Sequence, residues 1–125
     1  MEREGTFHKK LKQFIHEYIL LGYKVSEKFL KSEIFGMTSQ VRRALLSIML
    51  NYVEGFGRSK KKVMLNFYET SFGSLQESIY VFYLAACLKY ISAEEYTKLF
   101  SCKEQIAKML WKTIEGLRND IEKEP

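Results

Sequence analysis

Residues 36–62, GMTSQVRRALLSIMLNYVEGFGRSKKK, decide the fold of this chain. On a helix with about 100° per residue, their apolar side chains fill about half of the circumference or more. These side chains are Met37, Val41, Ala44, Leu45, Leu46, Ile48, Met49, Tyr52 and Val53. A helix at the surface of a single bundle needs an apolar face only about 100° wide. We therefore expect a second subunit to cover the excess apolar surface.

A narrow polar stripe runs along the same helix. It consists of Gln40, Arg43, Ser47, Asn51, Glu54 and Arg58. Glu77, which falls in a polar stripe of the next expected helix, is a candidate partner for Arg42 or Arg43. The polar stripe and Glu77 are thus candidate interface residues.

The excess positive charge of the chain lies in the same stretch. The whole sequence has 20 Lys and Arg against 15 Asp and Glu, a net charge of +5. Residues 36–62 contain only one acid, Glu54, and their basic residues are Arg42, Arg43, Arg58, Lys60, Lys61 and Lys62. Such a patch attracts RNA, DNA or an acidic protein surface. The structural alternative is a solvated turn whose arginines form scattered ion pairs.

Hydrophobic periodicity predicts four helices, at about residues 7–30, 37–57, 60–90 and 93–120. The one proline, Pro125, ends the chain, so proline interrupts no helix. Because short turns join long helices, we predict an all-α fold, an antiparallel up-down-up-down four-helix bundle that forms one domain over residues 1–125.

Capping signals mark the helix ends. Ser92 and Glu95 have the spacing of a capping box at the start of the fourth helix. Ser59 is expected to cap the third helix. Gly55 and Gly57 are expected to close the second near a left-handed C-cap.

The sequence contains no catalytic or metal-binding motif that we recognise. An H-E-x-x-H motif, a nucleophile elbow, a phosphate-binding loop and the E-x-x-H pair of di-iron bundles are all missing. Cys87 and Cys102 lie in apolar helical patterns, so we expect buried, reduced thiols. An enzyme with an unfamiliar mechanism would use Asn51, Glu54 and Glu77, but ion pairing explains the two carboxylates, Glu54 and Glu77, more simply. We expect a non-enzymatic protein without metal or cofactor, and His8 and His16 at its surface.

The sequence also bears on location. No apolar segment of the kind found in signal peptides follows residues 1–5. The longest apolar run, from Ile79 to Leu88, is about half as long as a membrane-spanning helix requires. We expect a cytoplasmic protein with no membrane partner.

Several motifs resemble the signature of the 23S rRNA intervening-sequence proteins. They are Gly36–Ala44, Ser47-Ile48, Asn51, Glu54-Gly55, Gly57-Arg58, Phe67, Gly73-Ser74-Leu75, Glu77, Leu88 and Tyr90-Ile91-Ser92. The resemblance implies a bacterial antiparallel four-helix bundle that forms homopentamers, in a family whose molecular function is not established. A related bundle, the accessory protein of diversity-generating retroelements, is a pentamer that binds nucleic acid and a reverse transcriptase through a basic surface.

The sequence thus favours a homo-oligomer, by resemblance a pentamer, that binds RNA or DNA through Arg42, Arg43, Arg58, Lys60, Lys61 and Lys62. The alternative is a protein-interaction scaffold whose basic turns bind an acidic protein without nucleic acid.

Overall fold

The computed structural model describes residues 5–125, and every regular element within that range is helical. The long helices are α1 (Thr6–Ser26), α2 (Met37–Phe56), α3 (Lys61–Cys87) and α4 (Ala93–Glu122). A short 3-10 helix, η1 (Lys31–Glu33), lies between α1 and α2. The prediction of an all-α chain with four helices is confirmed. Residues 1–4, which entered the argument about secretion, lie outside the described residues.

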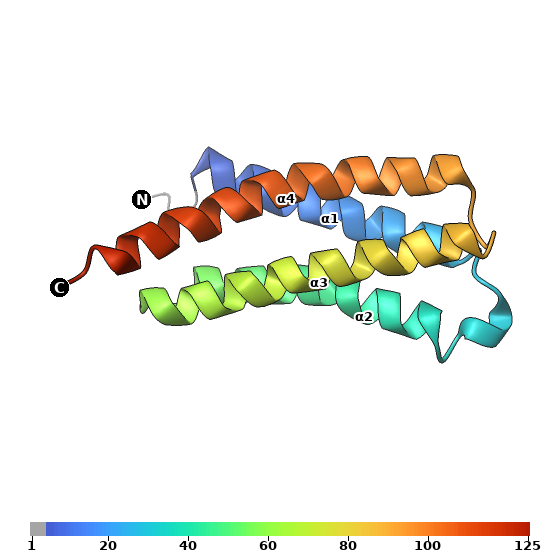
Figure 1. Ribbon diagram of the computed structural model, residues 1–125, viewed down its shortest axis with the longest axis horizontal. Coiled ribbons are helices and arrows are strands. Elements are labelled where there is room, and N and C mark those ends of the chain that lie inside the picture. Colours follow the sequence, from blue (N-terminus) through green and yellow to red (C-terminus); the bar gives the residue numbers. More distant parts are fainter. Residues whose placement is uncertain (1–4) are drawn as a thin grey trace.

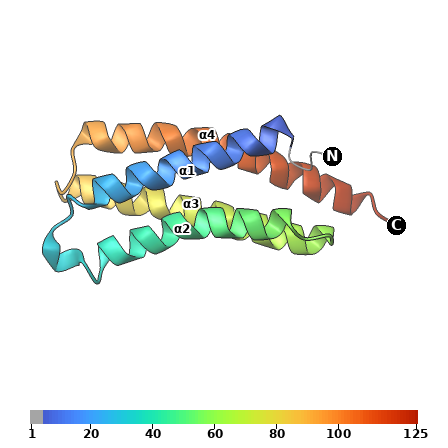
Figure 2. The ribbon, with the colours of Figure 1, turned by 180° about the vertical axis from the view of Figure 1, so that it is seen from behind.

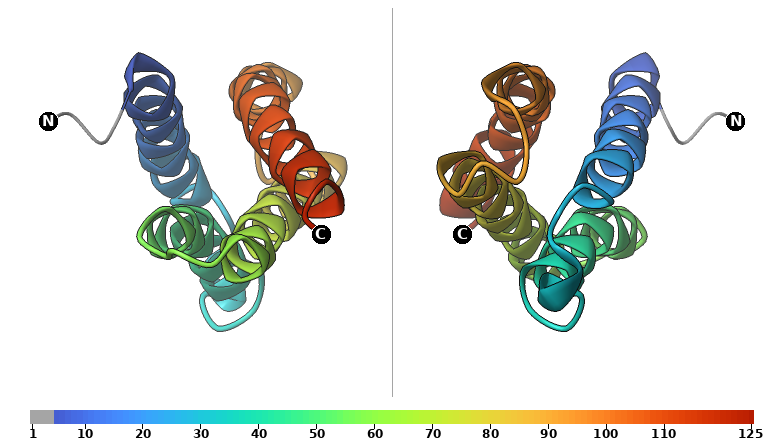
Figure 3. Two further views of the ribbon diagram at one scale, coloured as in Figure 1. Left: turned by 90° about the vertical axis from the view of Figure 1, so that its left-hand side faces the viewer. Right: turned by 90° about the vertical axis from the view of Figure 1, so that its right-hand side faces the viewer.

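The helices form two layers. α1 packs against α2 and α4, and α3 packs against the same two helices. Figures 1 and 2 show α1 and α4 on one side of the molecule and α2 and α3 on the other, and Figure 3 shows these layers end-on. Residues 27–36 and 88–92 lie together at one end, called here the connection end (Figure 1). The turn of residues 57–60 lies at the opposite end, the turn end.

The core between the layers combines large apolar side chains with hydrogen-bonded hydroxyls. Its largest fully buried side chains are Tyr18, Tyr52, Tyr68, Phe82, Leu11, Ile15, Leu45, Ile48, Leu75, Leu99, Ile106 and Leu110. Ser71 Oγ donates to the carbonyl oxygen of Ile48 at 2.7 Å, and Ser78 shares a 2.8 Å hydrogen bond with the Tyr18 hydroxyl. Small hydroxyl residues therefore let α3 approach its neighbours without leaving their own polar atoms unpaired.

Two helices end earlier than the periodicity predicts. α1 stops at Ser26, not Leu30, and the Ser26 hydroxyl donates to the carbonyl oxygen of Tyr23 at 2.8 Å. Such a local hydrogen bond competes with the helical backbone pattern. α3 stops at Cys87, not Tyr90, because Lys89 adopts a left-handed conformation with φ of 64°. Apolar residues continue beyond both ends, which explains the longer predictions.

The capping predictions have mixed outcomes. The box at α4 is confirmed, since Glu95 N donates to Ser92 Oγ at 3.1 Å and Ser92 N donates to Glu95 Oε1 at 2.8 Å. Ser59 does not cap α3, because the N-cap residue is Lys60 and no side chain bonds there.

The predicted left-handed cap of α2 is also wrong. Gly57 has φ of −83°, and no glycine among residues 5–125 has a positive φ. Gly55 has a packing role instead, because a Cβ added there would lie 2.8 Å from Cε1 of Tyr68. The glycine thus allows α2 and α3 to approach closely.

The two cysteines are less buried than the sequence pattern predicts. Cys87 and Cys102 are free, but Cys87 is exposed and Cys102 is half-buried, so the expectation of two buried thiols is wrong. The apolar pattern was misleading because it continues through Tyr83, Leu84 and Leu88, which are partly exposed as well.

Within residues 5–125, no helix has the length and apolar character needed to cross a membrane.

Candidate nucleic-acid interface and the groove beside it

The six basic residues of the predicted nucleic-acid site are spread along α2 and the turn after it. Arg42 and Arg58 are 16 positions apart in the sequence, which corresponds to about 24 Å along a helix. The structure therefore separates Arg42 and Arg43 from the cluster at the turn end, which consists of Arg58, Lys60, Lys61 and Lys62.

Arg42 has a clear role within the chain. Its Nε donates to Ser26 Oγ at 2.9 Å, and its guanidinium lies 5.1 Å from the ring centroid of Tyr23. Both contacts hold α2 against the end of α1. The suggestion that Glu77 pairs with Arg42 or Arg43 is wrong, because Glu77 accepts a hydrogen bond from the side-chain amide of Gln40.

The turn end is the most basic part of the described chain. Arg58 pairs with Glu54 one turn earlier and lies over the ring of Phe67 at 5.3 Å. Lys61 Nζ is 3.2 Å from a carboxylate oxygen of Glu124, and both side chains are about half exposed. Lys60 and Lys62 are exposed and have no ion-pair partner within residues 5–125.

The start of α3 is electrostatically unfavourable. No acidic residue stands in its first turn, and no side chain caps it. The N-terminus of a helix carries partial positive charge, so neighbouring cations are repelled and anions are attracted. Three consecutive lysines at this position therefore leave a strong local positive potential without compensation from the helix itself.

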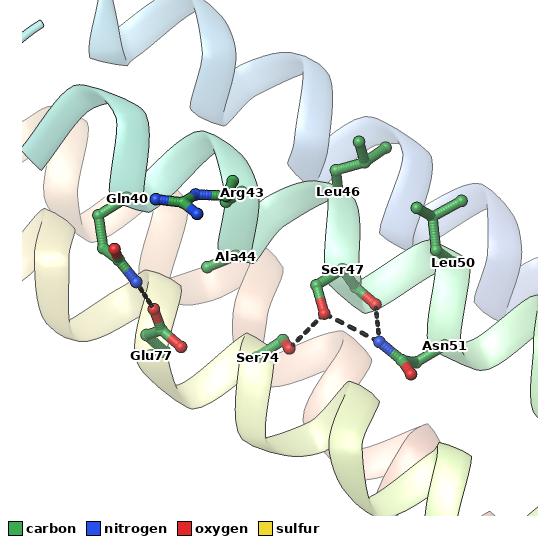
Figure 4. Close-up of a pocket in the computed structure, with 9 residues that line it drawn as sticks. All are labelled: Gln40, Arg43, Ala44, Leu46, Ser47, Leu50, Asn51, Ser74 and Glu77. Atoms are coloured by element: carbon green, nitrogen blue, oxygen red, sulfur yellow. Dashed lines mark hydrogen bonds between the residues drawn. The ribbon is translucent and has the colours of Figure 1, made fainter. Parts of the chain in front are cut away.

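A groove with a volume of about 480 Å³ lies between α2 and α3, away from the turn end (Figure 4). Residues 40–51 of α2 and residues 74–77 of α3 border it. Ser47 and Ser74 share a 2.8 Å hydrogen bond across it, and Asn51 Nδ2 donates to Ser47 Oγ at 2.9 Å. The rim carries Leu46 and Leu50, which are 47% and 57% exposed. The groove thus has a paired polar floor and apolar side chains facing solvent.

Most of the predicted polar stripe lies in this groove. Gln40, Arg43, Ser47, Asn51 and Glu77 line it, whereas Glu54 is directed to its ion pair with Arg58. The residues proposed for an enzyme therefore do not converge: Asn51 bonds Ser47, Glu77 bonds Gln40, and Glu54 bonds Arg58. No group of three or more His, Cys, Asp or Glu in the described chain has an arrangement that would hold a metal ion.

Two features of this region were not predicted from the sequence. Leu50 was not counted in the apolar face of α2, although it lies one helical turn after Leu46 and the two line the same rim. His8 was expected at the surface, but it is half-buried and its Nδ1 is hydrogen-bonded with the Tyr52 hydroxyl. Helical spacing alone is enough to place Leu50 beside Leu46. The partial burial of His8 depends on how α1 crosses α2, which the sequence pattern does not show.

Comparisons with known proteins agree with this fold. Residues 9–112 match the family model described as 23S rRNA-intervening sequence protein, which confirms the resemblance found in the sequence. A similar solved structure is that of a protein with unknown function from the S23 ribosomal protein family of Bacteroides thetaiotaomicron. It is 21% identical, has a TM-score of 0.76, and the match covers 83% of this chain and 97% of the other. At this identity the likeness shows the fold alone. A comparison with curated proteins gives no match.

Proposed function

This chain belongs to the 23S rRNA-intervening sequence protein family, and from that premise we propose a non-enzymatic, self-associating helical bundle that binds RNA or DNA at its turn end. The observation that carries the proposal is the run of Lys60, Lys61 and Lys62 at the uncapped start of α3. A phosphate group beside this run relieves the repulsion between the lysines and the helix dipole. Arg58 adds a cation on the other side of the turn.

Self-association would place several such turns in one particle. Leu46, Leu50 and Val53 are 47%, 57% and 50% exposed on α2, although their neighbours on the same helix are buried. Exposed apolar side chains at successive turns of one helix support a contact with another copy. Family resemblance favours a pentamer, in which five basic turns would bind one nucleic acid with avidity.

Salt dependence of binding tests the nucleic-acid proposal. Fluorescence anisotropy with mixed-sequence single-stranded RNA should give an affinity that falls steeply with salt, with a slope of about −0.7 per neutralised phosphate. Substitution of Lys60, Lys61 and Lys62 by Ala should reduce the magnitude of the slope by about 2.

A matched control removes the same charge elsewhere. Ala at Lys98, Lys108 and Lys123, three exposed lysines of α4 and its end, should leave the slope unchanged. If both triple variants lose affinity equally, binding reflects net charge and the turn end is not the site. If the unmodified protein does not bind RNA or DNA at low salt, the nucleic-acid proposal is wrong.

Assembly has its own test, with two leucines of equal exposure. Leu50→Lys on α2 should dissociate the oligomer in multi-angle light scattering, because it places a charge in the proposed contact. Leu20→Lys on α1 should not, although Leu20 is 58% exposed and Leu50 is 57% exposed. A monomeric unmodified protein at micromolar concentration contradicts the proposed assembly.

One feature favours the alternative role as a protein-interaction scaffold. A row of aromatic rings, Tyr80, Tyr83, Tyr96 and Phe100, crosses α3 and α4 with centroids 5.7–6.3 Å apart. Three of them are at least 41% exposed, and exposed aromatic clusters are common at protein interfaces. A protein partner that stays bound after nuclease treatment, and is lost when the exposed Tyr80 and Phe100 are replaced by Ala, would support this role over the first.

A further inference from the structure

A second cavity, with a volume of about 550 Å³, opens at the turn end among all four helices. Its apolar and aromatic walls come from Phe7 and His8 of α1, Phe56 of α2, Met64 and Tyr68 of α3, and Leu117 of α4. This volume is within the range of small-molecule sites, which are commonly apolar with a few polar groups. We call this cavity the end cleft.

Tyr68 is the unusual residue of the end cleft. Its side chain is 1% exposed, and its hydroxyl oxygen is the buried side-chain polar atom within residues 5–125 that has no hydrogen-bond partner. The comparable hydroxyl of Tyr18 is paired with Ser78 at 2.8 Å. Burial raises the pKa of Tyr68 from its ordinary value of 10.0 to about 12. A tyrosine hydroxyl is protonated at neutral pH at either value, so it is available as a donor. A buried donor without an acceptor is unfavourable, and a ligand acceptor that displaces the atoms covering this hydroxyl would correct this.

The walls around Tyr68 are held in place before any ligand binds. The ring of Tyr68 stacks on Tyr52 with centroids 5.4 Å apart, and the Tyr52 hydroxyl is hydrogen-bonded with His8. His8 in turn lies against Phe56 at 4.9 Å. Because these rings fix one another, the cleft needs little rearrangement to accept an apolar body.

The charged groups of the cleft favour an anion. Lys112 and Arg58 line it, and Asp120 is the one acidic side chain among the lining residues. Lys112 has no ion-pair partner within residues 5–125, whereas Arg58 is paired with Glu54. The lining therefore has a net positive charge beside an apolar interior.

We propose that the end cleft binds a small, mainly apolar acid, whose body packs among the aromatic side chains and whose oxygen accepts a hydrogen bond from Tyr68. Lys112 and Arg58 attract the acidic group, and Asp120 limits that attraction. The site is separate from the exposed face of Lys60 and Lys62, although Arg58 borders both.

The test uses the full-length protein and anilinonaphthalene sulfonate, a fluorescent apolar acid. Gly116 lines the cleft, and a Cβ added there meets no atom within 4 Å. Gly116→Leu should therefore fill the cleft without a backbone clash and weaken probe binding at least about tenfold. Gly116→Ala, which adds little volume at the same place, is the matched control and should keep most of the affinity.

Tyr68→Phe tests the hydrogen bond. It should weaken the probe about threefold to tenfold, while the unliganded variant melts at the same or a higher temperature because an unpaired hydroxyl is removed. A lower melting temperature of the unliganded variant would mean that the hydroxyl is already paired without ligand, and it would overturn this role for Tyr68.

Two exposed residues test the preference for an acid. Lys112→Gln should weaken the sulfonate probe about twofold to fivefold, and Asp120→Asn should strengthen it by a similar factor. The neutral analogue phenylnaphthylamine should respond to neither change. Unchanged probe affinity in Gly116→Leu overturns the site. Stronger sulfonate binding in Lys112→Gln together with weaker binding in Asp120→Asn overturns the preference for an acidic ligand. RNA affinity of Gly116→Leu should be normal, so this proposal and the nucleic-acid proposal fail independently.

Discussion

The two ends of this bundle treat their polar groups differently. At the connection end, side chains from separate segments satisfy one another: Lys28 donates to Glu95, which also closes the capping box of α4, and the Tyr90 hydroxyl donates to Glu33 at 2.9 Å. At the turn end, α3 starts without a cap, and the Tyr68 hydroxyl is buried without a partner.

This difference bears on which end of the bundle maintains the fold and which end is the candidate binding site. Buried or terminal polar groups normally find partners, because an unpaired group costs free energy. Within residues 5–125, the buried side-chain polar atom that lacks a partner, the Tyr68 hydroxyl, lies at the turn end beside the end cleft. The connection end is therefore the better candidate for holding the fold, and the turn end is the better candidate for binding.

The largest expected effect comes from deleting an aromatic ring at each end. Phe29 is 6% exposed and packs against Phe82 and Tyr90, with centroids 6.2 and 6.0 Å away. Phe29→Ala should lower the free energy of unfolding by about 3–5 kcal/mol. Phe56→Ala should cost roughly half as much, because Phe56 is half-buried beside an existing cavity. Chemical denaturation measures both, and equal losses would remove the distinction between the ends.

Smaller effects of opposite sign are expected for two of the buried tyrosines, Tyr18 and Tyr68. Tyr18→Phe removes a hydroxyl that is hydrogen-bonded with Ser78, so it should lower the free energy of unfolding by about 1 kcal/mol. Tyr68→Phe removes an unpaired hydroxyl and should raise the free energy of unfolding by about 1 kcal/mol. Denaturant midpoints measured without ligand decide the signs. A loss in Tyr68→Phe would mean that its hydroxyl already has a partner in solution.

The capping residues provide the next pair. Ser92→Ala removes the capping box of α4 and should cost about 1 kcal/mol. Lys60→Asp supplies the missing cap of α3 and removes a cation from its N-terminus, so it should gain about 0.5–1 kcal/mol. The same variant should bind RNA more weakly. Thermal melting with and without RNA measures both effects, and a destabilised Lys60→Asp would show that the start of α3 is not strained by its charge.

The sequence predicted features that depend on neighbours along one helix. The Ser92 and Glu95 box is correct because both halves of the signal lie within four residues. The number and type of helices are correct because periodicity is a local pattern. The polar stripe of α2 also depends on spacing within one helix, and most of its residues lie together along the groove.

Features that depend on contacts between helices were missed or misassigned. Gly55 was interpreted as a helix cap, but its lack of a Cβ serves the approach of Tyr68 from α3. Glu77 was assigned to an arginine, but the rotation of α3 places it beside Gln40. The end cleft combines residues from four helices, and no spacing within one helix predicts that combination.

The smallest expected effect is the pH dependence of the Lys28 and Glu95 pair. The hydrogen bond from Lys28, followed by that from the Ser92 backbone, lowers the pKa of Glu95 from its ordinary value of 4.5. A carboxyl whose pKa is lower in the folded state stabilises the fold above its unfolded pKa and loses this contribution as pH falls through its folded pKa. Lys28 is 59% exposed, so solvent screening limits the contribution of the pair to less than about 1 kcal/mol.

Lys28→Met removes this pair and keeps the capping box. The melting temperature should therefore be lower than that of the unmodified protein at pH 7, and the difference should shrink below about pH 4.5 as Glu95 becomes protonated. Lys61→Met at the turn end breaks a pair whose two side chains are 44% and 51% exposed, so it should change the melting temperature little. If Lys61→Met costs as much as Lys28→Met, the polar contacts of the two ends contribute equally to stability. The unpaired groups of the turn end would then have to be explained by binding alone.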